Sequence, residues 1–146
     1  MNNLNAIGDK EGLIPQDPWN LLREVNFTRP NFIEATAQVP IDSCWFSGHF
    51  PGEPILPGIA LISSVWEAIV RKAAGEGREV RLCALKRVRF TKPVRPGENL
   101  LITIESSSDG EDVLYSFKIN DKEDVVCSGL ILSGVLKEES KEDGNA

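Results

Sequence analysis

Two positions near the middle of the chain could together move a proton and stabilise a negative charge. His49 is the only histidine, and its side chain has an unperturbed pKa near neutrality, which suits a general base. Pro57 and Gly58 follow at the start of an apolar run, and Pro57 fits the first turn of a helix. The free N–H groups of such a helix start can hold an oxygen that becomes negative during a reaction. A base and an oxyanion site therefore lie close together in sequence.

The apolar run from Ile59 to Ala74 predicts the helix that would position this amide. Its apolar residues cover most of the helical circumference, which indicates a helix enclosed by other structure. Gly75 is expected to end it in a left-handed conformation. Polar residues at spacings of three and four predict one stripe along the helix: Ser63, Ser64, Glu67 and Arg71. A polar stripe on an enclosed helix indicates an active-site cavity or a subunit interface.

The remaining segments predict mainly strands. Residues 17–22 read as a short helix, with Asp17 as N-cap and Pro18 at the first helical position, whereas Phe32 to Pro40 alternates like a half-buried strand. Four later segments have strand character and are separated by turn signals: 80–91, 100–106, 113–120 and 125–136. One long helix with adjacent antiparallel strands predicts an α+β fold in which a sheet wraps around the helix.

Length and composition bound the organisation of the chain. Its 146 residues suit one domain with a real core, which we place at 15–136, between a flexible N-terminus (1–14) and a disordered charged tail (137–146). The apolar runs are too short to span a bilayer, and the first residues lack the features of a secretory signal. We therefore expect a cytoplasmic protein that does not insert into a membrane.

The cysteines indicate neither a disulfide framework nor a metal site. Cys44, Cys83 and Cys127 are widely separated, lack a Cys-x-x-Cys spacing, and have a single histidine to assist them. We expect no metal or other cofactor and interpret these residues as small core side chains. Cys44 lies close to His49 in sequence, so a reactive thiol is the less favoured interpretation of this residue.

The net charge of −6 conceals a basic segment. Between Arg71 and Arg95 there are nine cations and two acidic residues, so this segment carries +7 and the rest of the chain −13. A basic zone on an acidic protein indicates an anionic partner, and a solvated strand and turn is the alternative. Nucleic acid is disfavoured because the overall charge repels phosphate and no aromatic residues alternate with the cations.

Two separated strings carry a family resemblance. His49-Phe-Pro-Gly-Glu-Pro-Ile-Leu-Pro-Gly58 resembles the active-site signature of the bacterial β-hydroxyacyl-acyl-carrier-protein dehydratases of hot-dog fold, the FabA/FabZ type. Lys86-Arg-Val-Arg-Phe-Thr-Lys-Pro-Val-Arg-Pro-Gly-Glu98 resembles the strand and turn that follow the central helix in that family. The similarity covers roughly residues 15 to 135.

The resemblance implies dehydration of (3R)-hydroxyacyl thioesters on an acyl carrier protein, in fatty acid or related synthesis. His49 would take the first proton, and the Gly58 N–H would bind the thioester oxygen. Hot-dog proteins pair their sheet edges, so it also implies a homodimer or higher homo-oligomer with active sites between subunits. The expected substrate-binding residues are Phe50, Pro57, Ile59 and Trp66. The cations expected to dock the acidic carrier are Arg71, Lys72, Arg87, Arg89 and Lys92.

The chain departs from this family at one catalytic position. There the histidine works with a Glu or Asp fourteen residues further on, contributed by the partner subunit, and that position is Ser63. Glu67 is the nearest candidate donor, but it lies four residues on, about 6 Å along the helix axis. Its structural interpretation is an ion pair with Arg71 at the favourable i to i+4 spacing.

Two other functions remain open beside dehydration. Hot-dog thioesterases use the same helix terminus to polarise a thioester for attack by water, although their usual acidic residue is also missing at Ser63. A non-catalytic acyl-thioester-binding homologue would keep the shape without the acid.

Overall fold

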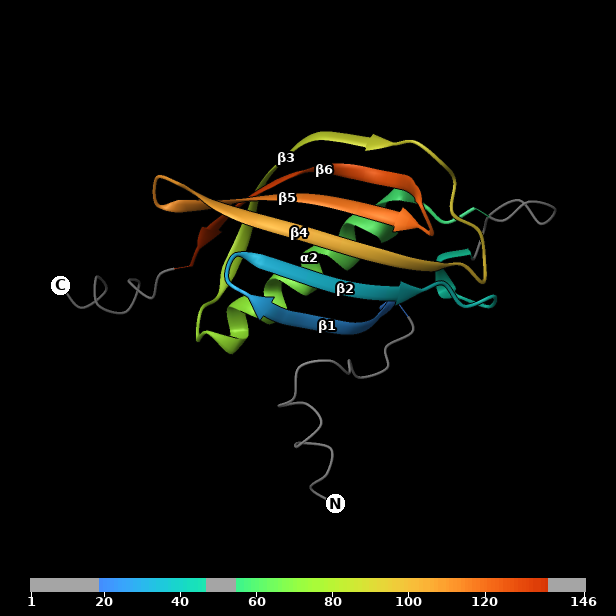
Figure 1. The fold of residues 1–146 in the computed structure, drawn as a ribbon, viewed down its shortest axis with the longest axis horizontal. Coiled ribbons are helices and arrows are strands. Elements are labelled where there is room, and N and C mark those ends of the chain that lie inside the picture. The colour runs from blue at the N-terminus through green and yellow to red at the C-terminus, as the bar shows by residue number, and fades with distance from the viewer. Residues whose placement is uncertain (1–18, 47–54, 137–146) are drawn as a thin grey trace, which may run out of the picture.

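The computed structural model describes residues 19–46 and 55–136. A six-stranded antiparallel sheet, in the order β1-β2-β4-β5-β6-β3, packs against one long helix (Figure 1). The elements are β1 (Leu22–Arg29), β2 (Phe32–Gln38), the short 3₁₀ helix η1 (Cys44–Phe46), α2 (Gly58–Gly75), β3 (Val80–Phe90), β4 (Asn99–Asp109), β5 (Asp112–Asp121) and β6 (Asp124–Val135). The prediction of an α+β fold with a sheet around one helix is confirmed.

Alternation along the strands builds the core. In β2 the side chains of Ile33, Ala35 and Ala37 are at most 2% exposed, whereas the intervening residues face outward. In β5, Phe117 and Ile119 are buried in the same way. Because successive strand residues point to opposite faces, one face of the sheet is apolar and forms a single cluster with α2.

The predicted short helix over residues 17–22 is wrong where the structure describes it. Asp17 and Pro18 lie outside the described residues, but Leu22 already begins β1 and pairs with Ala37 of β2. The Leu22 N–H donates to Asn20 Oδ1 at 3.0 Å, a local bond that starts a turn rather than a helix. Pairing with β2 then satisfies the backbone of the following residues, which a single helical turn could not do as well.

The left-handed residue after α2 is Gly77 rather than Gly75. Gly75 is the last helical residue, Glu76 follows at φ −101°, and Gly77 has φ +76°. The N–H groups of Glu76, Gly77 and Arg78 donate to the carbonyl oxygens of Ala73 and Ala74. The helix therefore includes the first glycine as its last residue, and the second glycine makes the turn.

β3 is an edge strand with an unusual surface. Leu82 and Leu85 are each 43% exposed, and Arg87 has φ +53° inside a register shift between Lys86 and Arg89. Such a bulge locally redirects side chains. Cys83 on this strand is exposed and Cys44 only half-buried, so the expected core position is wrong for Cys83 and right for the buried Cys127.

The predicted N-terminal and C-terminal tails, 1–14 and 137–146, lie outside the described residues. The proposal of one domain over 15–136 stays a prediction.

Candidate active site

The start of α2 presents backbone donors without a cap. Pro57 is the N-cap, with φ −63° and ψ 145°, and it makes no side-chain cap hydrogen bond. Ala60 N–H donates to the Pro57 carbonyl at 3.0 Å, but the N–H groups of Gly58 and Ile59 have no acceptor among residues 19–46 and 55–136. The first turn also contains no acidic residue. This helix start can therefore stabilise an anionic oxygen.

The fold brings the two sequence motifs together at this point. The Leu56 N–H, two residues before the helix, donates to the Val94 carbonyl at 2.8 Å. Leu56 and Val94 are only 4% and 1% exposed. A buried backbone hydrogen bond thus holds the end of the first motif against the turn that follows β3, and it fixes the position of the Gly58 amide.

Phe90, the last residue of β3, is the contact that sequence reasoning missed. A Cβ built on Gly58 would lie 2.6 Å from Phe90 Cζ and 2.7 Å from Cε1. The edge of the phenyl ring therefore occupies the space where any other residue would have a side chain. Two features of the sequence could have indicated this contact: a glycine where something approaches closely, and an aromatic residue in the second motif.

His49 and Phe50 lie outside the described residues. Their assigned roles, as general base and as substrate contact, remain proposals. The segment that carries them joins Phe46 of η1 to Ile55, which precedes the helix start.

The other predicted substrate contacts are Pro57 and Ile59 at the start of α2 and Trp66 farther along the same helix. Pro57 and Trp66 are half-buried, with Trp66 packed against the core cluster. Ile59 is 58% exposed. An apolar surface therefore lies beside the Gly58 amide in the isolated chain.

The predicted polar stripe is only partly correct. Ser63 is exposed and Glu67 and Arg71 are half-exposed, but Ser64 is buried at 4% exposure. The Ser64 hydroxyl donates to the Ala60 carbonyl one turn earlier at 3.1 Å. Ser64 lies on the core-facing side of α2, where this back-bond satisfies its hydroxyl, so it belongs to the core and not to the stripe.

Glu67 forms the ion pair that its spacing predicted. Arg71 Nε lies 3.0 Å from Glu67 Oε2, and the two side chains are 32% and 37% exposed. Such a pair on a helix surface contributes about 0.3–0.5 kcal/mol. The structural interpretation of Glu67 is confirmed, and its role as a displaced proton donor stays a proposal.

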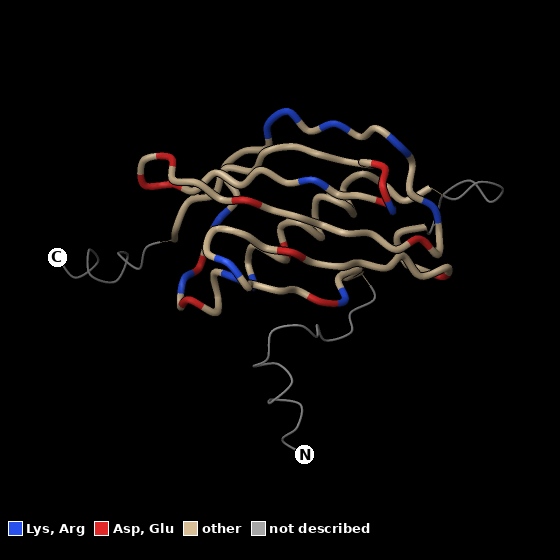
Figure 2. Tube along the Cα trace, viewed as in Figure 1, with Lys and Arg blue, Asp and Glu red and all other residues tan. Residues whose placement is uncertain are grey.

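The five predicted docking cations fall into two groups. Arg71, Lys72 and Lys92 are engaged with acidic residues: Lys72 Nζ lies 2.5 Å from Glu76, and Lys92 Nζ lies 2.9 Å from Asp124. The hydrogen bond to Asp124 raises the pKa of Lys92. Arg87 and Arg89 form no ion pair within the described part of the chain. Figure 2 shows the line of cations along β3 and the segment after it.

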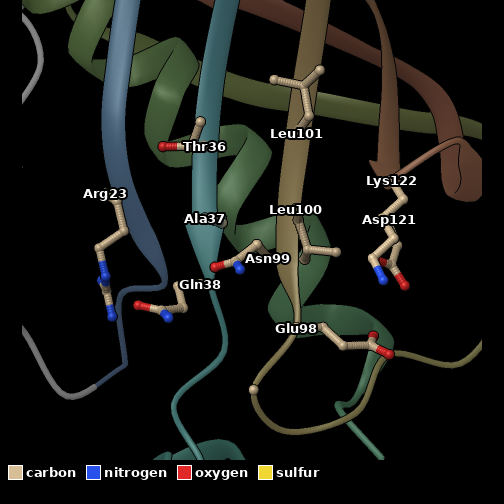
Figure 3. A pocket seen from close by; sticks show the side chains of 11 residues that line it. Arg23, Thr36, Ala37, Gln38, Glu98, Asn99, Leu100, Leu101, Asp121 and Lys122 are labelled. Carbon is tan, nitrogen blue, oxygen red and sulfur yellow. The ribbon is translucent and has the colours of Figure 1, made fainter.

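Two surface hollows formed by described residues lie away from the helix start. One, of about 820 Å³, is formed by the ends of β1, β2 and β4 with the β5–β6 turn, and Arg23, Glu98, Asp121 and Lys122 contribute charges of both signs (Figure 3). Another, of about 470 Å³, is lined by Trp19 and by residues of the segment 41–46, which include Cys44. Neither includes a residue of α2 or a predicted site residue.

Residues 19–46 and 55–136 contain no group of three or more His, Cys, Asp or Glu side chains placed to hold a metal ion. Burial raises the pKa of Cys127 to about 11, so this thiol is an inert core group at neutral pH. Within the same residues, no helix has both the length and the apolar character needed to cross a bilayer.

Comparison with known proteins finds similarity to a family and to individual proteins named as dehydratases. The ApeI-like family, described as ApeI dehydratase, matches residues 26–130. FabZ, the 3-hydroxyacyl-[acyl-carrier-protein] dehydratase of Blochmanniella floridana, is 32% identical over 89 residues, which cover 57% of this chain and 59% of that protein. FabZ of Lactobacillus helveticus is 36% identical over 103 residues, covering 66% of this chain and 68% of that one.

A solved structure shares the fold. The dehydratase heterocomplex ApeI:P from Xenorhabdus doucetiae matches with a TM-score of 0.63 at 21% identity, over 79% of this chain and 97% of that one. The chain spans about three fifths of the length of the B. floridana relative. Because the family match covers well over half of its residues, the chain belongs to the ApeI-like dehydratase family.

Proposed function

We propose that this protein eliminates water from (3R)-hydroxyacyl thioesters carried by an acyl carrier protein and yields trans-2-enoyl thioesters. The observation that carries the proposal is the uncapped start of α2 at Gly58, which follows the His49 signature in a chain of a dehydratase family. The FabZ relatives, named 3-hydroxyacyl-[acyl-carrier-protein] dehydratases, support the choice of substrate.

The proposed reaction uses groups at both ends of the segment from His49 to Gly58. The imidazole of His49 removes a proton from C2 of the acyl chain, and the electron pair of that C–H bond forms the C2=C3 double bond. The C3–O bond breaks and hydroxide leaves. During proton removal the thioester oxygen gains negative charge, and the Gly58 N–H at the positive end of the helix dipole stabilises it.

The leaving hydroxide needs a proton that Ser63 cannot supply as a strong acid. Losing a general acid typically costs about 10²- to 10⁴-fold in rate. In the proposed site the imidazolium formed in the first step returns its proton to the hydroxide, and the exposed Ser63 hydroxyl holds the departing oxygen. The carboxyl group of Glu67 is occupied by Arg71. The expected enzyme is therefore slower than one with the acid.

The proposed assembly is a dimer or higher homo-oligomer with sites between subunits. Two features support it: the exposed face of α2 that carries Ser63, and the edge of β3, which pairs with no other described strand on its outer side and carries exposed Leu82 and Leu85. A free edge with apolar side chains invites pairing with another strand.

The proposed docking surface for the carrier consists of Arg87 and Arg89, because the other three cations are held in ion pairs. The carrier is acidic and presents a phosphate group. Replacing both arginines with Glu should raise the KM for an acyl carrier protein substrate at least about tenfold. The KM for the same acyl group on free pantetheine should stay unchanged. Lys118→Glu, an exposed lysine of β5, is the control with the same change of charge per site.

Incubation with 3-hydroxyacyl-acyl carrier protein, while the conjugated enoyl product is followed, tests the function directly. His49→Ala should lower kcat by about 10²- to 10⁴-fold, whereas Glu105→Gln, an exposed residue of β4, should not. The assignment fails if the protein does not turn over, or if His49→Ala is as active as the parent. Release of free thiol from acyl-CoA without enoyl product would identify a thioesterase instead.

A further inference from the structure

The aromatic ring of Phe90 lies against Gly58, the residue whose N–H is the proposed oxyanion donor. The Cβ position of Gly58 would be 2.6, 2.7 and 3.1 Å from the Cζ, Cε1 and Cε2 atoms of Phe90. These distances are shorter than a carbon–carbon contact allows. Only glycine at residue 58 leaves room for the ring in this position.

The backbone beside the ring is firmly held. Phe90 pairs with Cys127 of β6, and the next residue makes two bonds to the same region. Thr91 N–H donates to the Val126 carbonyl at 2.9 Å, and the Thr91 hydroxyl donates to the Val125 carbonyl at 2.6 Å. The position of the ring over Gly58 is therefore set by the end of the β3–β6 ladder.

The ring is nevertheless not buried in the core. Phe90 is 54% exposed, and Ile59, which follows Gly58, is 58% exposed. A single exposed apolar residue needs no explanation. Here both lie beside Gly58: Ile59 follows it in the chain, and the ring of Phe90 contacts the position of its Cβ.

We propose that Phe90 determines specificity by forming the apolar wall of the acyl site beside the Gly58 amide. This inference rests on the proposed function and assigns a substrate contact to a residue outside the His49 signature. The flat ring contacts the acyl carbons next to the thioester and keeps water from the Gly58 N–H. Because hydrogen bonds in a water-poor site are electrostatically stronger, the wall improves the oxyanion contact as well as binding.

The contact between the Phe90 ring and Gly58 can be tested by measuring thermal stability. Gly58→Ala adds a methyl group against the ring and keeps the backbone N–H. The decrease in Tm should be larger by at least about 3 °C when residue 90 is Phe than in the Phe90→Ala variant, where the space is empty. Gly75→Ala is the matched control, since a Cβ there meets nothing within 4 Å. Equal decreases in Tm in both backgrounds would show that the Phe90 ring does not occupy the space beside Gly58.

Kinetics test the wall. Phe90→Ala and Gly58→Ala should each lower kcat/KM for a straight-chain 3-hydroxyacyl-carrier substrate by about tenfold, as is usual when an apolar contact is lost. The double variant should be no worse than Phe90→Ala alone, because the ring is already gone. Substrates branched beside the thioester should gain relative to straight ones in Phe90→Ala. Leu101→Ala, 39% exposed on β4, should change none of these values.

Binding of a 2-enoyl-pantetheine thioester, measured by calorimetry, separates this inference from the proposed function. If the parent binds without turnover, and Phe90→Ala binds about tenfold more weakly, the dehydratase assignment fails while the wall stands. Phe90 is not the wall if the decreases in kcat/KM caused by Gly58→Ala and Phe90→Ala multiply in the double variant. The same conclusion follows if Phe90→Ala changes neither binding nor turnover. A parent that neither binds nor turns over overturns both.

Discussion

The two ends of α2 are built in opposite ways. At its C-terminal end, backbone N–H groups bond the last carbonyls, and Lys72, Glu76 and Arg78 form a chain of ion pairs. At its N-terminal end, Pro57 offers no capping side chain and the first turn has no carboxylate. One end of the same helix is thus satisfied from within the chain, and the other has no cap among the residues that the structure describes.

The difference between the two ends shows that the N-terminal end of α2 lacks a stabilising contribution that helices commonly have. A good N-cap contributes about 0.5–2 kcal/mol, and this helix does without one while its start lies between two exposed apolar side chains, Ile59 and Phe90. A helix end without a cap needs another partner. A substrate oxygen is the partner that the proposed function supplies.

The largest expected effect comes from adding the missing acid along the uncapped end. Ser63→Glu places a carboxyl group at the position where the resemblance described above implies one, and it should raise kcat for dehydration by up to about 10²- to 10⁴-fold, because the leaving hydroxide gains a general acid. Ser63→Gln, with the same size and no acid, is the control. Activity that appears only in Ser63→Glu would mean that the natural protein does not dehydrate this thioester.

A smaller effect is expected from capping the helix start. Pro57→Asp supplies an acceptor and a negative charge, so it should stabilise the helix by up to about 1 kcal/mol. It should also lower kcat/KM at least about tenfold, since the carboxylate places a negative charge beside the Gly58 amide and repels the oxygen that becomes negative there. Pro57→Ala removes the ring without adding an acceptor and is the comparison. Equal turnover in both variants would show that the donors are not used.

At the satisfied end, two glycines should respond in opposite directions. Gly77→Ala should cost about 1 kcal/mol of unfolding free energy, because Gly77 has φ +76° and a Cβ is disfavoured there. Gly75→Ala should instead gain about 0.5–1 kcal/mol, since Gly75 is helical and its surroundings are open. Denaturant unfolding measures both, and a loss at Gly75 would contradict the observed helix end.

The sequence predicted the elements whose alternation or apolar run is regular. Residues 32–40 and the segment that forms β5 agree with the structure because alternate residues along each strand are buried. The prediction also holds for β3, although none of its residues is buried. β1 was not predicted, because its register shifts go with an irregular order of buried and exposed residues along the strand. The position of Ser64 was misjudged since helical spacing alone gives a stripe and not its orientation to the sheet.

The site was predictable only as far as its local part. The helix start at Pro57 and Gly58 follows from residue types, as does the ion pair of Glu67 with Arg71. The contact of Phe90 with Gly58 is a tertiary one across 32 residues of chain, and no local pattern encodes such a distance. The pairing of Lys92 with Asp124 depended in the same way on how β3 meets β6.

The smallest expected effect tests the ion pairs that close the satisfied end. Hydrogen bonds from Lys72 and then Arg78 hold the pKa of Glu76 below its ordinary value. A carboxyl group with a lowered pKa in the folded state stabilises the protein above its unfolded pKa, and this contribution is lost as the pH falls through the folded value. Glu76→Gln should therefore cost about 0.5 kcal/mol at neutral pH and low salt, because the pair is partly exposed. The deficit should vanish in acid.

Urea unfolding of the parent and of Glu76→Gln at pH 7 and near pH 3, with and without added salt, measures this difference. Dehydration should not change in Glu76→Gln, because the residue follows the end of α2 opposite to Gly58. Glu98→Gln is the control: it also removes one carboxylate, and its side chain is in none of the ion pairs of the described residues. If Glu76→Gln lowered turnover while leaving the unfolding free energy unchanged, the division of α2 into a stabilising end and a reacting end would be wrong.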